Sequence, residues 1–335
     1  MKRDGRISLL RVIGMLCIIL CHFFSWIGIS SLSQLFNVGI FVFLMISGYL
    51  YSAQDIKKHR NWLIKRWKYL YIPVYLWLFV VVIFLLVKLQ RLPGLKEFLL
   101  VLFNLQGIPW ILTFLPKIGQ MGGILGCLGH LWFLTVIYIC YMLLLLVKRY
   151  EVYFNKHYRI LAIVAIVCFV ILALFNINII YFICFFIGYA VGKTKIVYSK
   201  KTMIYGTIVM ILAIGIRLIT RRVLDGMVVY DTIIVGGSHT ILAGSMFILV
   251  SYLYASSRSV RSFAESIAVR IIDEYSYFIY ITHYLFLSSS FGLKTLNTGM
   301  VMKTAIFVIA SIITAVLLKM ATDFLENKVV AESRK

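Results

Sequence analysis

The chain has 335 residues, 62% of them hydrophobic and 14% charged, with a mean hydropathy of +0.97. This composition excludes an ordinary soluble domain and is typical of an all-α protein that crosses a membrane many times. The formal net charge of +22 would by itself suggest a nucleic-acid partner. The basic residues, however, gather in short loops between apolar runs, as in cytoplasmic loops that face anionic lipid. We therefore expect a membrane-lipid environment and no nucleic acid.

The first apolar run, residues 7–29, contains two ionisable side chains, Arg11 and His22, with ten residues between them. Eleven helical steps return the chain to nearly the same face, about 16 Å further along the axis. Ionisable groups inside a membrane usually face a bundle interior or a wet cavity, and they mark functional sites. The run is too long for a cleaved signal peptide, and Arg11 interrupts it.

Each of these two residues has a functional and a purely structural interpretation. A neutral His22 imidazole could accept the proton of an alcohol as a general base, or only hydrogen-bond across helices. Arg11 could hold a phosphorylated ligand that enters from the cytoplasm, or extend toward lipid phosphates. Cys17 and Cys21 lie near His22, but the cysteine spacing is not that of a zinc site, so we expect no metal.

Ten apolar runs are long enough to cross a bilayer, which requires about 17–25 residues. They are residues 7–29, 35–53, 69–88, 130–147, 159–175, 178–192, 202–219, 233–254, 274–291 and 301–322. An eleventh candidate, 97–115, is interrupted by Gly107 and Pro109, and we predict that it is re-entrant or interfacial.

The distribution of lysine and arginine predicts the orientation of these spans. With ten spans and a cytoplasmic N-terminus, the inside loops hold 22 basic residues and the outside loops hold 6. This asymmetry indicates that both termini are cytoplasmic, and we expect a multi-pass protein of a bacterial plasma membrane. No repeat and no soluble segment stands out, so we predict one membrane domain over residues 1–335.

The loop before the third span carries cations and an aromatic ring that could bind the phosphates and base of a nucleotide. These residues are Lys65, Arg66, Lys68 and Tyr69. A positive-inside loop with interfacial aromatics explains the same residues.

Two later segments hold further polar candidates. His130 and Trp132 open the fourth span on its outer side, while Tyr280 and His283 lie in the ninth span. His283 near the middle of the membrane favours a polar interior. Interfacial placement of His130, and plain helix packing around Tyr280, are the alternatives.

Several of these segments together resemble the membrane-bound acyltransferase 3 family. Residues 11–23, RVIGMLCIILCHF, resemble its hallmark of an arginine and a histidine separated by ten residues. The second span ends in Ser47-Gly48-Tyr49, similar to the Ser-Gly-Tyr or Ser-Gly-Phe ending of that family. The segments KRWKYLYIPVY, HLWFLTVIYICY and SYFIYITHYLF are similar to the later motifs of the family, in the same order. Where many members carry an acidic residue shortly before the motif arginine, this chain has Ser8.

The resemblance implies acyl transfer, most often of acetyl, from cytoplasmic acyl-coenzyme A to a hydroxyl of a cell-surface or capsular polysaccharide or its lipid-linked precursor. It implies His22 as the general base and Arg11 at the donor site. Lys65, Arg66, Lys68 and Tyr69 would hold the donor, while Ser47, His130, Trp132, Tyr280 and His283 would support the site or the acceptor.

The residues leave two other classes of protein open. A glycan polymerase, a flippase or another transporter also has many spans and intramembrane charges. Two similar halves, as many transporters have, are not evident here. A structural or regulatory membrane protein would leave Arg11 and His22 unexplained. The oligomeric state stays open, a homo-oligomer included.

Overall fold

The computed structural model describes residues 3–56, 59–89, 94–103, 105, 127–157, 160, 163–164, 167–168, 171, 179–194, 198–224, 227, 230–287, 292–293 and 296–332. Every regular element within these ranges is helical, which confirms the predicted all-α class. The backbone divides into two compact units. The first unit is Met1–Cys21, Ile29–His59 and Cys140–Asp273, and the second is His22–Gly28, Arg60–Ile139 and Glu274–Lys335.

Seven helices in the described part of the chain are long and apolar enough to cross a membrane, so the protein is polytopic. They coincide with seven of the predicted spans. They are formed by α1 (Gly5–Trp26), α2 with α3 (Ser30–Phe36, Val38–Ser52), α4 (His59–Leu89), η2 with α8 (Gly129–Leu131, Trp132–Arg149), α12 (Lys200–Leu224), η3 with α13 (Tyr230–Val235, Gly236–Ser256) and α16 (Met300–Glu332).

The other predicted spans have different outcomes. The run 178–192 forms α11 (Ile180–Lys193), which is apolar but short. The run 274–291 forms the end of α15 (Ile267–Thr282) and the 3₁₀ turn η4 (His283–Phe286). This segment is not among the seven because it also holds three charged residues, Arg270, Asp273 and Glu274.

Two further predictions fall largely outside the described residues. Most of the run 159–175 is not described. The helix α5 (Leu95–Leu102) covers the start of the predicted re-entrant segment 97–115, and most of the remainder is not described. The total of ten spans therefore stays a prediction.

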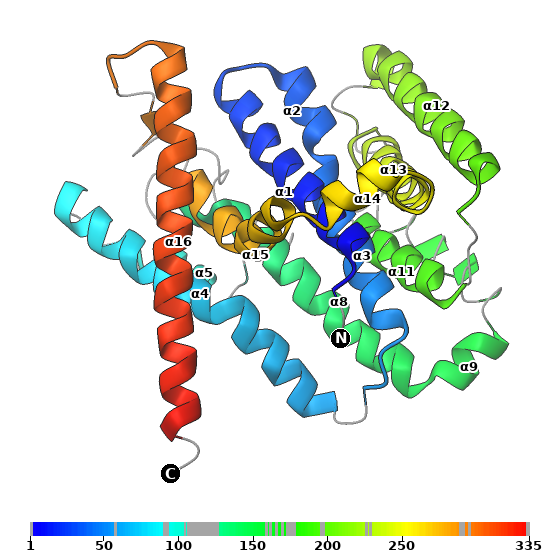
Figure 1. The fold of residues 1–335 in the computed structure, drawn as a ribbon, viewed down its shortest axis with the longest axis horizontal. Helices are drawn as coiled ribbons and strands as arrows, with labels where there is room; N and C mark the ends of the chain where they lie inside the picture. The colour runs from blue at the N-terminus through cyan, green and yellow to red at the C-terminus, as the bar shows by residue number, and fades with distance from the viewer. Residues whose placement is uncertain are drawn as a thin grey trace. The chain divides into compact units, whose positions relative to one another are not determined.

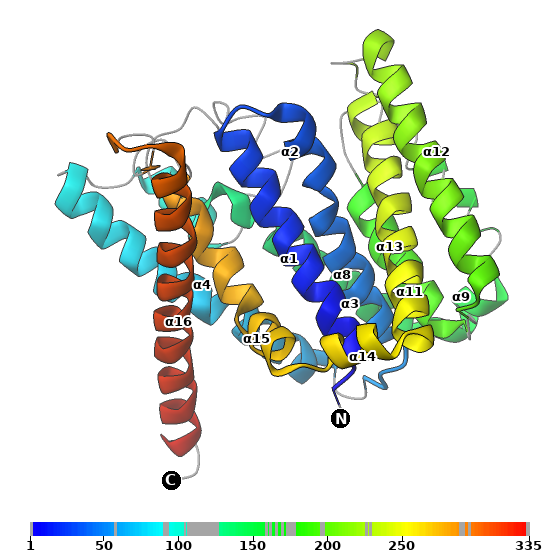
Figure 2. The same ribbon diagram turned by 45° about the horizontal axis from the view of Figure 1, so that its top comes forward.

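The first unit is organised around α3, which packs closely against α11 and also against α13. The helices α13 and α12 lie side by side (Figures 1 and 2). The contact of α3 with α11 depends on glycine, because a Cβ at Gly48 would overlap the Phe185 carbonyl oxygen. A Cβ at Gly188 would overlap the Met45 carbonyl oxygen. Small residues allow two membrane helices to approach backbone to backbone, and this explains the glycine of the Ser47-Gly48-Tyr49 motif. The short helices α9 (Glu151–Lys156) and α14 (Arg258–Ala264) complete this unit.

In the second unit, α4 is joined to α8 and to the end of α15 by tyrosine hydroxyls. The Tyr71 hydroxyl donates to the Leu134 carbonyl oxygen at 3.1 Å. The Tyr277 hydroxyl donates to the Leu70 carbonyl oxygen. The acceptor residue Leu70 lies three residues before Pro73, which has no N–H to donate within α4.

Candidate functional site

Three histidines far apart in the sequence lie together in the second unit. His22 is on α1, His130 in η2 and His283 in η4. The ring centroid of His22 lies 5.4 Å from that of His283 and 6.2 Å from that of His130, and the latter two are 5.2 Å apart. The ring of Tyr284 lies 4.8 Å from both His22 and His130. We call these three histidines the histidine cluster.

Main-chain carbonyl groups determine how two of these rings carry their protons. His130 Nε2 lies 3.0 Å from the Tyr280 carbonyl oxygen. His283 Nδ1 lies 3.0 Å from the Ile279 carbonyl oxygen and 2.9 Å from that of Tyr280. A carbonyl oxygen only accepts hydrogen bonds, so each of these nitrogens carries the hydrogen. His130 Nδ1 and His283 Nε2 are then acceptors, and both are buried without a hydrogen-bond partner.

The local backbone explains why these carbonyl groups are available. The helix α15 ends at Thr282, and the chain continues as a 3₁₀ turn. His283 therefore bonds back to the last turn of α15. On the other side, the Tyr280 hydroxyl donates to the His130 carbonyl oxygen at 2.7 Å. Tyr280 thus holds His130 through both its main chain and its side chain.

Exposure separates the three rings. His130 is 6% exposed and His283 is fully buried, whereas His22 is partly exposed. His22 is thus the least buried of the three residues. The acceptor nitrogens of its two neighbours could stabilise an imidazolium that forms on His22. In these tautomers His130 and His283 offer lone pairs to the cluster, so they are not hydrogen-bond donors for an oxyanion.

Arg11 lies in the first unit and has an acidic partner that the sequence did not indicate. Its Nη1 is 3.8 Å from Oδ1 of Asp273, and its side chain is 39% exposed. Arg3 also pairs with the Asp273 carboxylate, which is 6% exposed. Asp273 therefore supplies a carboxylate near Arg11, although the position before the arginine is occupied by Ser8. The signal available in the sequence was the acidic pair Asp273-Glu274 at the start of the run 274–291.

The four residues predicted to hold the donor lie on α4 in the second unit. Lys65, Lys68 and Tyr69 are exposed, and Arg66 is half-buried with its guanidinium 5.6 Å from the Trp62 ring. Tyr69 stacks on Tyr277 at 5.9 Å. Helical spacing places Lys65, Lys68 and Tyr69 on one face of α4, so they can meet one ligand.

Two further predicted residues are Trp132 and Ser47. Trp132 directly follows η2, and its ring lies 6.5 Å from the ring of Phe133. Ser47 belongs to the first unit and is half-buried on α3.

Sequence reasoning missed an aromatic cage around Arg6 in the first unit. The guanidinium of Arg6 lies 5.2–5.7 Å from the rings of Tyr49, Tyr198 and Phe247. It also donates a hydrogen bond of 2.9 Å to the Tyr49 hydroxyl. Arg6 was counted only as a positive-inside residue, and no spacing pattern distinguished it. Tyr49, the last residue of the Ser-Gly-Tyr motif, therefore orients a cation close to the start of α1.

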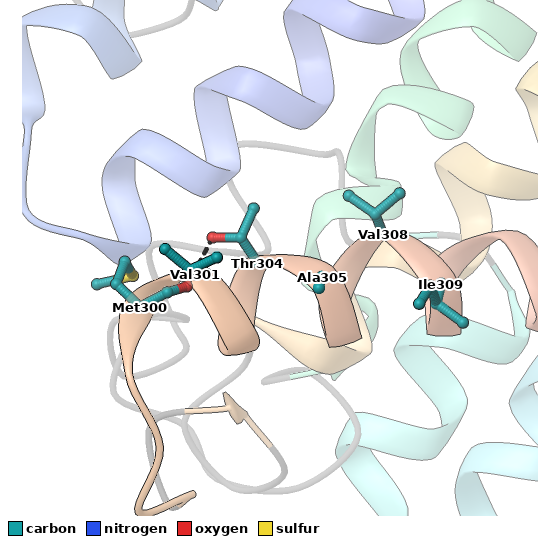
Figure 3. A pocket seen from close by; sticks show the side chains of 6 residues that line it. All are labelled: Met300, Val301, Thr304, Ala305, Val308 and Ile309. Carbon is teal, nitrogen blue, oxygen red and sulfur yellow. Dashed lines mark hydrogen bonds between the residues drawn. The ribbon is translucent and has the colours of Figure 1, made fainter.

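A groove of about 520 Å³ lies along α16 in the second unit (Figure 3). Its lining is Met300, Val301, Thr304, Ala305, Val308 and Ile309. The Thr304 hydroxyl donates a hydrogen bond of 2.9 Å to the Met300 carbonyl oxygen. The lining is otherwise apolar, and Val301 is 86% exposed, so the groove has the character of a lipid-facing surface.

No group of histidine, cysteine, aspartate and glutamate side chains suited to a metal ion occurs among the described residues.

Comparison with known proteins gives one match. The family model described as an acyltransferase domain, of the acyltransferase 3 type, matches residues 4–320. No curated protein and no solved structure matches the chain. The matched region covers nearly the whole chain and includes both units.

Proposed function

This chain belongs to the acyltransferase 3 family and is a multi-pass membrane acyltransferase, and we propose that it moves an acetyl group from acetyl-coenzyme A to a glycan hydroxyl. The acceptor would be a cell-surface or capsular polysaccharide or its lipid-linked precursor. The observation that supports this proposal is the grouping of His22 with two buried imidazoles whose acceptor nitrogens have no hydrogen-bond partner among the described residues. Family membership favours acyl transfer over polymerisation, flipping or transport without acyl chemistry.

In the proposed reaction, His22 takes the proton of the acceptor hydroxyl as its oxygen attacks the thioester carbonyl carbon. The new carbon–oxygen bond forms and the carbon–sulfur bond breaks, so the acetyl group becomes an ester. Coenzyme A leaves as a thiolate and takes the proton back from His22. The imidazolium N–H that does not face the reacting groups donates to the acceptor nitrogen of His130 or His283, and the main-chain contacts of Tyr280 keep both rings in that tautomer.

The donor is proposed to enter from the cytoplasm of a bacterial cell whose plasma membrane the chain spans as one membrane domain, both termini inside. Arg11, Lys65, Arg66 and Lys68 supply positive charge for its phosphates, and Tyr69 a ring for its base. Arg11 is well suited to this role because its ion pair with Asp273 is long, at 3.8 Å, and its side chain is partly exposed.

We expect Arg11→Gln to raise the KM for acetyl-coenzyme A by about tenfold with a smaller change in kcat, because one charge-assisted contact to phosphate is lost. Steady-state coenzyme A release from the purified protein in vesicles measures both constants. Arg258→Gln, an exposed arginine on α14 of the same unit, is the matched control. An unchanged donor KM in Arg11→Gln would remove this residue from the donor site.

The proposal is tested by supplying purified protein in vesicles with acetyl-coenzyme A labelled in the acetyl group. Surface glycan from the native host and an unrelated neutral glucan serve as acceptors. We expect release of coenzyme A together with alkali-labile label on the host glycan. Glycan that stays unlabelled while coenzyme A is released would contradict the acceptor class. The absence of release with acetyl-coenzyme A would contradict the donor.

A further inference from the structure

Arg217 is a buried cation in the first unit that the proposed chemistry does not use. It lies on α12, one of the helices able to span a membrane, and is 8% exposed. Its Nη1 lies 3.1 Å from His239 Nε2. Its Nη2 lies 3.2 Å from the side-chain oxygen of Gln34 and 3.4 Å from the main-chain oxygen of the same residue. The Tyr230 side chain is a further hydrogen-bond partner. Within the described residues, none of these groups is negatively charged, and no carboxylate pairs with Arg217.

His239 is held so that it cannot supply the missing negative charge. Its Nδ1 donates to the Val235 carbonyl oxygen at 2.8 Å, and its ring stacks on Phe41 with centroids 5.2 Å apart. Its Nε2 lies 2.8 Å from the Gln34 carbonyl oxygen, which also only accepts hydrogen bonds. Whether the ring carries one proton or two, it supplies no negative charge to the guanidinium of Arg217. A buried guanidinium without a counter-charge is costly in a membrane, and such residues mark ligand or ion paths.

The positive-inside pattern does not explain this cation. In the proposed orientation Arg217 lies at the outer end of α12, where lysine and arginine are scarce. Arg221 follows one turn later, and its Nη1 lies 3.4 Å from the Ser31 hydroxyl on α2. Arg217 could also serve only to join α2, α12 and α13, but a neutral glutamine would make such contacts without the cost of a buried charge.

We propose that Arg217, held by His239 and Gln34, binds an anionic group of the acceptor, a carboxylate or a phosphate. The acceptor would then be an acidic glycan or a glycan phosphate. This inference rests on the proposed function and makes its acceptor class more specific. The guanidinium has five N–H donors, and its contacts with Gln34 and with the Tyr230 hydroxyl leave part of them for such a group. Planar bidentate recognition of carboxylate or phosphate is what distinguishes arginine from lysine.

The test measures binding by thermal stability of the purified full-length protein in detergent, with glucuronate, glucose 1-phosphate and glucose as probes. A ligand that binds only the folded state raises the midpoint temperature of thermal unfolding once the ligand concentration exceeds its Kd. We expect glucuronate or glucose 1-phosphate to raise the midpoint and glucose to leave it unchanged. The anion that acts at lower concentration identifies carboxylate or phosphate as the preferred group.

Arg217→Gln should raise the apparent Kd for that anion by at least about tenfold, because a charge-assisted hydrogen bond is lost. Arg217→Lys keeps the positive charge and should retain part of the anion binding. This variant tests the site if Arg217→Gln does not fold. Arg258→Gln should behave as the unchanged protein. Equal stabilisation by glucose, no stabilisation by either anion, or undiminished anion binding in both Arg217 variants would overturn the inference.

Coenzyme A release from labelled acetyl-coenzyme A is measured on the same preparations. Loss of release together with intact anion binding would contradict the acyl-transfer proposal alone. Release together with absent anion binding would contradict the Arg217 site alone.

Discussion

Replacing His22 with alanine is expected to lower the rate of acetyl transfer by about 10²–10⁴-fold, because general-base action by a positioned imidazole contributes a factor of this order. Transfer of labelled acetyl to the acceptor by protein in vesicles measures the loss. The thermal midpoint should change little, since the His22 ring is partly exposed and makes no hydrogen bond to a described residue.

His157→Ala is the matched control for this substitution. His157 follows α9 in the first unit, and its ring contacts only Tyr153 among the described aromatic side chains, at 4.6 Å. It should keep the full transfer rate. If His22→Ala transferred acetyl at nearly the normal rate while folded, His22 would not be the base.

The second large effect concerns stability. Gly48→Ala places a Cβ against the Phe185 carbonyl oxygen and 2.8 Å from the Tyr189 nitrogen, both main-chain atoms of α11. Backbone cannot rotate away as a flexible side chain can, so α3 and α11 must separate. Overpacking of this kind costs about 1–3 kcal/mol, and Gly48→Val should cost more. Unfolding of the detergent-solubilised protein by heat measures the loss.

Gly215→Ala on α12 is the control for the change in helix propensity. No atom lies within 4 Å of a Cβ at Gly215. Alanine should therefore be tolerated there, with a gain of up to about 1 kcal/mol from its higher helix propensity. Equal stability of Gly48→Ala and the unchanged protein would show that α3 and α11 do not approach as closely as described.

Hydropathy and charge were sufficient to predict the fold class, because an apolar run of membrane length has few other ways to satisfy its backbone. Hydropathy and charge were less reliable for a segment that carries charged residues and changes its helix type. The run 274–291 was predicted as an ordinary span, yet α15 begins at Ile267, carries Asp273 and Glu274, and changes to a 3₁₀ turn at His283. Local patterns do not indicate such a change of helix type.

The candidate site was predictable in part. Helical periodicity singled out Arg11 and His22, and the positions of His130 and His283 within apolar runs marked them as costly polar groups. Their tautomers depend on the carbonyl groups of Ile279 and Tyr280, and hence on tertiary contacts that no spacing encodes.

Contacts between distant parts of the chain escaped prediction for the same reason. Arg11 and Asp273 are separated by most of the sequence, and the position shortly before Arg11 is occupied by Ser8, which is not acidic. Gly48 was noted as part of a motif with Ser47, but its role in helix packing follows from the backbone of α11.

The central claim is that the histidine cluster carries out acyl transfer through His22, with His130 and His283 as its supporting acceptors. The most direct measurement is single-turnover transfer of labelled acetyl from acetyl-coenzyme A by the purified protein, in which His22, His130 and His283 are changed to glutamine one at a time and together. We expect the greatest loss of transfer rate for His22→Gln and smaller losses for His130→Gln and His283→Gln. The triple variant should lose little more than His22→Gln, since the three rings act as a unit. Transfer at the normal rate by a folded triple variant would contradict this claim.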